Sequence, residues 1–165
     1  MIDLTKFCAN KTEVREYLQA PFQLGECVYA TNGHLAVRIP RDEAPHITEH
    51  PSAPKSAQKL FDDTFALEGE FAALPAPDSL PANRTCTDCG GTGIEPASED
   101  EDYCFTCYGL GVMPDPMDVG DANFKLPYVR LMASLPNARI RTHGPSKPAA
   151  ILFDGGQGLL MPYRK

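Results

Sequence analysis

The chain has 165 residues, 42% of them hydrophobic, and a formal net charge of −7. This length suits one domain with an apolar core of its own, so folding does not depend on disulfides. No apolar run approaches the roughly 18 residues of a membrane-spanning helix, and the first residues lack the basic and apolar regions of a secretory signal. The sequence therefore predicts a soluble, cytoplasmic protein without a membrane partner.

Charge is distributed unevenly along the chain. Residues 1–85 carry a net charge of −4, residues 86–122 carry nine acidic side chains and no Lys or Arg, and residues 123–165 carry a net charge of +6. A middle segment without basic residues indicates an insertion that repels nucleic acid. Only the basic last segment favours DNA, so the sequence predicts weak, salt-sensitive DNA binding at most.

The first elements expected are short helices. Asp3 is placed to cap a helix over residues 4–9, because its carboxylate can accept from the free N–H groups of the first turn. Residues 12–18 form a second helical candidate, which Pro21 would end because proline lacks an N–H and clashes with the preceding turn. Both segments lie before the strongest strand signal of the chain.

A β-hairpin is expected over residues 27–39. Strands over 27–31 and 34–39 flank Asn32-Gly33, a pair typical of a type I′ turn, in which both central residues take positive φ. Apolar and polar residues alternate along 34–39, so one face of that strand is expected in the core.

Between the hairpin and the middle segment, one helix and one strand are expected. The helix spans residues 55–62 and turns three apolar side chains inward, namely Ala57, Leu60 and Phe61. A strand is expected over 65–71, and the proline-rich stretch 74–84 is interpreted as a linker.

The last segment predicts a helix followed by strands. Pro127 fits the first turn of a helix, whose apolar stripe consists of Tyr128, Leu131, Met132 and Leu135. Strands are expected over 138–143, 149–154 and 159–163, with a turn at 155–158. Together these elements predict an α+β fold, an antiparallel sheet with short helices.

Four of the six cysteines form two Cys-x-x-Cys pairs, Cys86 with Cys89 and Cys104 with Cys107. Fourteen residues separate the pairs, and each continues as Cys-x-x-Cys-x-Gly-x-Gly, in CTDCGGTG and CFTCYGLG. Two such turns supply four soft ligands for a tetrahedral Zn²⁺, and the glycines let amide hydrogens point at the sulfurs. The pattern favours one structural Zn²⁺ over a redox dithiol pair or an iron–sulfur centre.

The repeated motif resembles the cysteine-rich zinc module of DnaJ-type co-chaperones over residues 86–111. That family has four repeats and two zinc sites, whereas the two repeats here imply one zinc. The His-Pro-Asp motif of a J-domain is absent from the sequence. The resemblance implies a zinc hairpin set into another fold, and it carries an alternative function as a zinc-dependent protein-interaction or chaperone-like module that binds unfolded clients.

Two other segments resemble bacterial DNA polymerase sliding clamps. The stretch YATNGHLAVRIP is similar to the clamp segment Ala-Thr-Asp-Gly-His-Arg-Leu-Ala, with Asn for Asp and without the Arg. Residues 124–165 are similar to the last half of the final clamp domain, and MPYR takes the place of its Met-Pro-Met-Arg end. The resemblance implies one clamp-like domain, made of residues 1–85 and 123–165 and interrupted by an acidic zinc module at 86–122.

The clamp resemblance also implies a groove for partner peptides. The corresponding turn and chain end line that groove in clamps, which nominates Thr31, Gly33, His34, Leu35, Met161, Pro162 and Tyr163. We expect an apolar pocket between the turn at 31–35 and the strand at 159–163. The alternative that these side chains belong to the core of the hairpin fold stays open.

No nucleophile–base pair, phosphate loop or paired-carboxylate pattern stands out in the sequence, so we expect no enzymatic activity. The expected function is that of a zinc-binding, sliding-clamp-like accessory protein in DNA replication or related transactions, acting through a protein or peptide partner. A monomer and a homo-oligomer such as a ring are both open. A small clamp-like chain with an inserted module would suit a bacteriophage or mobile element. An enzyme without a recognisable site is the third hypothesis.

Overall fold

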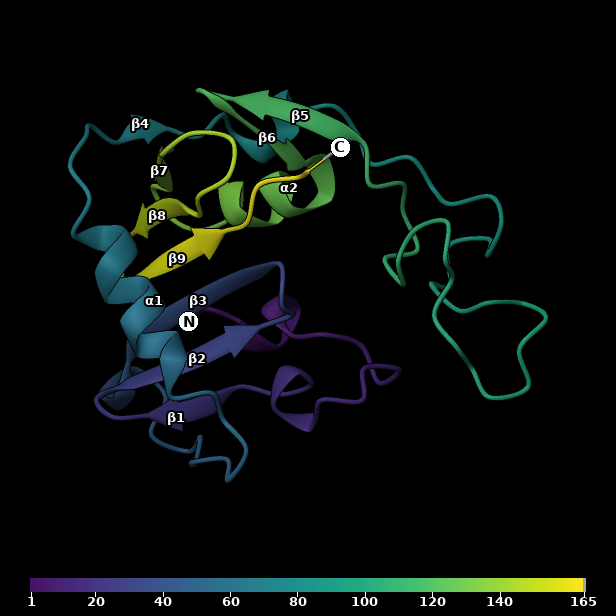
Figure 1. Ribbon diagram of the computed structural model, residues 1–165, viewed down its shortest axis with the longest axis horizontal. Helices are drawn as coiled ribbons and strands as arrows, with labels where there is room; N and C mark the ends of the chain where they lie inside the picture. The colour runs from purple at the N-terminus through teal and green to yellow at the C-terminus, as the bar shows by residue number, and fades with distance from the viewer. Residues whose placement is uncertain (165) are drawn as a thin grey trace.

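The computed structural model describes residues 1–164 (Figure 1). In chain order, the helices are η1 (Leu4–Phe7), η2 (Glu16–Leu18), η3 (Arg41–Glu43), α1 (Ser56–Phe65), η4 (Pro77–Ser79) and α2 (Leu126–Ala133), where η denotes a 3₁₀ helix. The strands are β1 (Phe22–Leu24), β2 (Cys27–Thr31), β3 (Leu35–Pro40), β4 (Ala72–Ala73), β5 (Pro116–Val119), β6 (Ala122–Lys125), β7 (Arg139–Arg141), β8 (Ala149–Phe153) and β9 (Gly156–Leu160). None of the helices in residues 1–164 has the length and apolar character needed to span a bilayer.

Seven strands form one sheet in the order β1-β2-β3-β9-β8-β7-β4, and every neighbouring pair is antiparallel. In its centre β3 pairs with β9, with Leu35 opposite Leu160, so the first and last parts of the chain share one sheet. The predicted α+β fold with an antiparallel sheet is confirmed. The four-cysteine segment leaves this body between β4 and β5 and extends to one side as loops (Figure 1).

The sheet buries apolar side chains on both faces. On one face Val37 and Ile151 belong to the larger core with Phe124 of β6 and Met132 of α2, all four of them fully buried. A second buried cluster joins the other face to α1, and it consists of Phe22, Tyr29, Phe61 and Leu159. Since neighbouring residues of a strand point to opposite faces, α1 and α2 cover opposite faces of the sheet.

β5 and β6 form a separate two-stranded hairpin. Its pairs run from Pro116 opposite Lys125 to Val119 opposite Ala122. Ala122 and Phe124 are buried in the larger core. The expected end of the inserted segment, residue 122, is the first residue of β6 and so lies inside this hairpin.

Several predicted elements are confirmed. Asp3 caps η1, accepting from the N–H of Thr5 at 3.1 Å, although η1 is a 3₁₀ helix shorter than the predicted one. β2 and β3 pair as the predicted hairpin. α2 has Pro127 in its first turn, and the three strands β7, β8 and β9 follow it.

The turn between β2 and β3 is not type I′, because Gly33 has a positive φ of +88° and Asn32 does not. Thr31 pairs with Ala36, so four residues connect the last paired positions. The side-chain oxygen of Asn32 accepts from the N–H of His34 at 2.9 Å and from the next N–H at 3.0 Å. The side chain of Asn32 therefore stabilises the turn through these two hydrogen bonds, whereas the sequence predicted a positive φ for Asn32 as well as for Gly33.

The predicted strand over 65–71 is wrong. α1 continues to Phe65, and the chain then loops around the guanidinium of Arg141, which donates to the carbonyl oxygens of Phe65 at 3.1 Å and Gly69 at 3.4 Å. The Cζ atom of Arg141 lies 4.5 Å from the ring centroid of Phe71. Burying this cation requires carbonyl acceptors, and supplying them keeps the segment out of the sheet.

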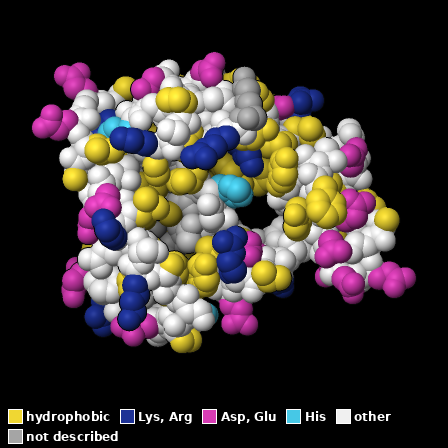
Figure 2. Space-filling model, in the orientation of Figure 1, with side chains coloured by type: hydrophobic (Ala, Val, Ile, Leu, Met, Phe, Trp, Pro, Cys, Tyr) yellow, Lys and Arg dark blue, Asp and Glu magenta, His cyan; other side chains and the backbone are white. Residues whose placement is uncertain are grey.

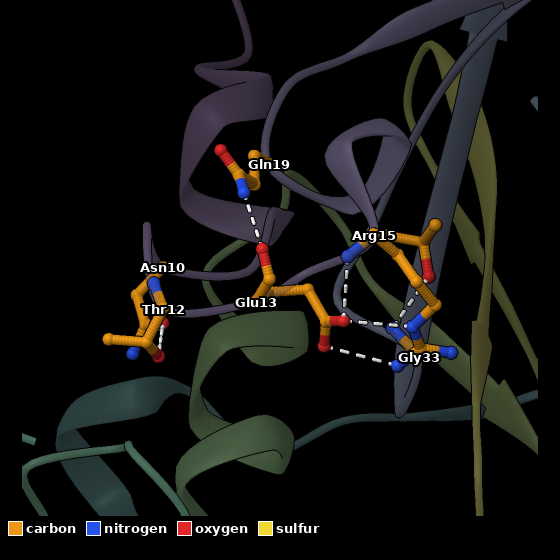
Figure 3. A network of polar contacts seen from close by, with 7 residues as sticks. Asn10, Thr12, Glu13, Arg15, Gln19 and Gly33 are labelled. Carbon is orange, nitrogen blue, oxygen red and sulfur yellow. Dashed lines mark hydrogen bonds and ion pairs between the residues drawn. The ribbon is translucent and has the colours of Figure 1, made fainter. Parts of the chain in front are cut away.

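The predicted helix over 12–18 is largely replaced by a polar network (Figure 3). Asn10 Oδ1 accepts from the N–H of Thr12 at 3.0 Å, and Glu13 Oε1 accepts from the N–H of Arg15 at 3.0 Å. Such local side-chain acceptors compete with helix hydrogen bonds for the backbone donors. Only the short η2 remains helical in this segment.

Two details of the last strand and of α1 also differ from expectation. The turn before β9 comprises residues 154–155, and β9 ends at Leu160, so residues 161–163 lie beyond the strand.

On α1, Phe61 is buried and Ala57 is half-buried, whereas Leu60 is 43% exposed instead of facing inward.

Candidate metal centre and neighbouring clefts

The four cysteines of the two repeats meet in one buried cluster. Their Sγ atoms all lie within 4.8 Å of one another, with 3.9 Å between Cys86 and Cys104 and 3.8 Å between Cys89 and Cys107. A disulfide would bring two sulfurs to about 2.05 Å, whereas four sulfurs at about 2.3 Å from a tetrahedral Zn²⁺ lie roughly 3.8 Å apart. The spacing fits four ligands around a single metal ion such as zinc.

The two repeats hold each other through matched backbone bonds. The N–H of Cys86 donates to the carbonyl oxygen of Gly111 at 3.0 Å, and the N–H of Cys104, 18 residues later, donates to that of Gly93 at 2.8 Å. Each repeat therefore completes the other, which gives the cluster a local twofold pattern. We call each Cys-x-x-Cys-x-Gly-x-Gly turn a knuckle. Residues 86–113, the part of the inserted segment for which the sequence predicts zinc, are called the zinc module from here on.

Backbone amide hydrogens point at the cysteine sulfurs, as the Cys-x-x-Cys-x-Gly-x-Gly pattern predicted. The N–H of Gly93 donates to Cys89 Sγ and the N–H of Gly111 to Cys107 Sγ, both at 3.3 Å. Burial opposes ionisation of Cys89, but donation from the backbone of Gly93 and Gly91 outweighs it and lowers the pKa of that thiol to about 6. At Cys107 burial dominates and raises the pKa to about 12. A bound metal cation would deprotonate such thiols outright.

Glycine at position 93 is required by the close approach of the two knuckles. Gly93 has φ +76°, and a Cβ there would lie 2.4 Å from the carbonyl oxygen of Gly109, whereas Gly90 has φ +60° with nothing within 4 Å of a Cβ. We expect Gly93→Ala to lower the zinc content of the purified protein strongly. Gly90→Ala, the matched control, adds only the cost of a left-handed alanine, about 1–2 kcal/mol, and should retain zinc. Equal zinc content in the two variants, measured by elemental analysis, would refute this packing argument.

Lys125 links the zinc module to the body. Its Nζ lies 4.7 Å from the ring centroid of Tyr108 in the module, 5.4 Å from that of Tyr163 and 5.8 Å from that of Tyr128. Burial lowers the pKa of this lysine. Aromatic faces attract cations electrostatically, so the three rings replace part of the water that Lys125 loses.

A hydrogen bond also attaches the module to the body, and an ion pair closes the base of the module. Asn10 Nδ2 donates to the carbonyl oxygen of Gly109 at 3.2 Å. Arg84 and Asp115, just outside the two ends of the module, form an ion pair in which Nε donates to Oδ2 at 2.8 Å. These contacts hold the module across a cleft from the body.

The nominated groove residues come together only in part. The N–H of Met161 donates to the carbonyl oxygen of His34 at 3.0 Å, so the turn and the chain end are adjacent. The ring of His34 stacks on Tyr128 with centroids 5.7 Å apart, and burial together with Lys125 lowers its pKa. Leu35, however, is 2% exposed and belongs to the larger core, which is the core placement that the sequence left open.

Two clefts flank the turn. Thr31 and Gly33 line an apolar pocket of about 420 Å³. Its walls are mostly apolar and aromatic, and they include Tyr17, Leu18, Tyr29, Leu60, Phe61 and Leu159. His34 lines a larger cleft of about 820 Å³ between the zinc module and the body (Figure 2). Met161, Pro162 and Tyr163 line neither of these two clefts.

The sequence predicted only part of the apolar pocket. Thr31, Gly33 and Leu159 belong to the turn and the strand between which we expect a pocket. Tyr17 and Leu60 come from other segments, and no local pattern connects them to that turn. Comparison with protein-family models, curated proteins and solved structures gives no match. The functional argument therefore depends on the chain's own residues, the four-cysteine cluster and the two clefts.

Proposed function

We propose that this chain is a non-enzymatic accessory protein of the sliding-clamp type that holds one structural zinc and binds a protein partner. The partner, a protein of DNA replication or related transactions, inserts a peptide into the apolar pocket. The observation that carries the proposal is the position of this pocket beside Thr31 and Gly33, two residues of the clamp-like turn. The hydrogen bond from Met161 to His34 supports it, because it joins the two clamp-like segments.

Zinc is the metal that the cluster supports best. Cys86, Cys89, Cys104 and Cys107 supply four thiolates, and four protein ligands close a tetrahedral shell. A closed shell leaves no position for water or substrate, so the ion would serve structure instead of catalysis. Elemental analysis of protein purified without chelator should give one zinc per chain.

The apolar pocket has the properties of a peptide anchor site. Its volume of about 420 Å³ lies within the range of roughly 300–1,000 Å³ of ligand pockets. Tyr29 and Phe61 form its floor with ring centroids 5.5 Å apart in an edge-to-face arrangement. Leu60 lies at the exposed side and Arg15 supplies a cationic group. The arrangement suits an apolar or aromatic side chain of a short peptide with a carboxylate nearby.

Replacing Leu60 by Glu tests the pocket directly. Because Leu60 is 43% exposed, the change should alter the free energy of unfolding by less than about 1 kcal/mol. Affinity for a fluorescent clamp-binding peptide with apolar anchors should fall by about 2 kcal/mol or more, the loss expected at a packed anchor. Fluorescence anisotropy gives the affinity, and thermal unfolding of the same samples gives the stability.

Leu67→Glu is the matched control, because Leu67 is 36% exposed and lies outside the pocket lining. It should leave peptide affinity unchanged. Equal affinity of all three proteins for the peptide, or none in the unmutated protein, would refute the anchor site. Binding of an unfolded client in place of the peptide would instead favour the DnaJ-type alternative.

A further inference from the structure

The two knuckles share one backbone but present different surfaces. The repeat of 18 residues matches Thr87 with Phe105 and Gly90 with Tyr108. Phe105 is 64% exposed and Tyr108 is 56% exposed. The second knuckle thus places aromatic rings in solvent where the first has small residues, and the zinc site itself does not require them.

Tyr103 extends this aromatic surface. It is 43% exposed, and its ring centroid lies 5.0 Å from that of Phe105. Tyr103 and Tyr108 both line the larger cleft. We call Tyr103, Phe105 and Tyr108 the aromatic patch; exposed aromatic residues gathered in this way mark interaction surfaces.

The backbone at Tyr108 supports a role outside the knuckle fold. Tyr108 has φ +55°, in the left-handed region that L side chains rarely adopt. The matching position of the first knuckle is Gly90 with φ +60°, so glycine satisfies the same backbone without strain. A tyrosine at such a position points to a use for its ring.

Charge around the patch selects the partner. The segment 86–122 carries nine acidic side chains and no Lys or Arg. Asp102 directly precedes Tyr103, and Asp88 accepts a hydrogen bond from the hydroxyl of Thr106, next to Phe105. Figure 2 shows acidic and hydrophobic side chains side by side on the zinc module. Carboxylates repel phosphates and attract cations, which opposes nucleic acid here.

One ring of the aromatic patch already contacts a cation of the chain itself. Nζ of Lys125 lies 4.7 Å from the ring centroid of Tyr108, while Tyr103 and Phe105 have no such contact among the residues that the structure describes. Lysine and arginine bind aromatic faces and carboxylates at the same time. We propose that the aromatic patch and the surrounding carboxylates bind a Lys- or Arg-rich segment of a protein partner.

The test uses the zinc-loaded full chain and a fluorescent decapeptide of alternating Lys and Ala. The variant Phe105→Thr installs the residue of the first knuckle, without any change in charge. We expect it to weaken binding about tenfold, a typical loss for an aromatic contact residue, with zinc content unchanged. Tyr103→Ser should weaken binding similarly, and Thr87→Ser, on the first knuckle, should not.

The proposal is independent of the apolar pocket, so Leu60→Glu should bind the basic peptide normally. Unchanged affinity of Phe105→Thr and Tyr103→Ser would overturn it, because charge alone would then explain the binding. Equal binding of an alternating Glu and Ala peptide would also overturn it. Tighter binding of a single-stranded oligonucleotide, lost in Phe105→Thr, would assign the patch to base stacking instead.

Discussion

Removing the metal with a chelator is expected to unfold the zinc module and leave the sheet folded. The cluster at the centre of the module consists of the four cysteines, and among residues 1–164 only Leu110 and Met113 are partly buried hydrophobic residues packed against them. Metal binding therefore supplies most of its folding free energy, and apparent values for structural zinc are about 10–16 kcal/mol. The sheet has two apolar cores of its own, so it should retain its cooperative thermal transition.

Replacing Cys104 and Cys107 together by Ser should reproduce this result, since only two thiolates would remain. Backbone amide resonances of residues 86–111 should collapse to unfolded positions, while those of β3, β8 and β9 stay dispersed. Cys27→Ser is the control, because Cys27 is half-buried outside the cluster and should leave zinc content unchanged. Loss of the sheet resonances on chelation would show that the body depends on the metal.

Truncating Leu35 is expected to destabilise the whole body. Leu35 is 2% exposed, lies opposite the fully buried Leu160 and belongs to the larger core. Leu35→Ala should lower the free energy of unfolding by about 2–5 kcal/mol, the usual cost of such a cavity. Met161 is 38% exposed beyond the end of β9, so Met161→Ala should cost less than about 1 kcal/mol. Urea unfolding of the two variants measures the difference.

This contrast separates two residues that the clamp resemblance nominates together. Peptide affinity should be measured on the same samples at a temperature where both variants are folded. If Leu35→Ala lost peptide affinity without losing stability, Leu35 would line a groove as the resemblance implies. The burial of its side chain predicts the opposite result.

Local sequence patterns predicted the cysteine cluster, the start of α2 and the buried face of β3. The Cys-x-x-Cys-x-Gly-x-Gly repeat predicted which sulfurs meet and why glycine follows them, because the knuckles use short-range geometry. Pro127 predicted the start of α2, and the alternation over 34–39 predicted the buried face of β3. In each case the physical cause lies within a few residues of the signal.

Other features depend on contacts between distant segments. The loop after α1 exists because Arg141, from β7, requires the carbonyl oxygens of Phe65 and Gly69. No residue near position 65 in the sequence predicts this contact with the guanidinium of Arg141. The apolar pocket likewise requires α1 to bring Leu60 to the β1–β2 face beside Tyr29. The sequence around each of these residues does not predict that they line one pocket.

The pairing of β3 with β9 has a consequence for the order of assembly. Arg38 and Gln157 are partners in the centre of the sheet, so this centre cannot close until the chain has been synthesised past residue 157. Closing such a long loop is slow because its entropic cost must be met before the contacts form. The four cysteines lie within residues 86–107 and emerge earlier. We therefore expect the metal to bind the nascent chain while the sheet is still incomplete.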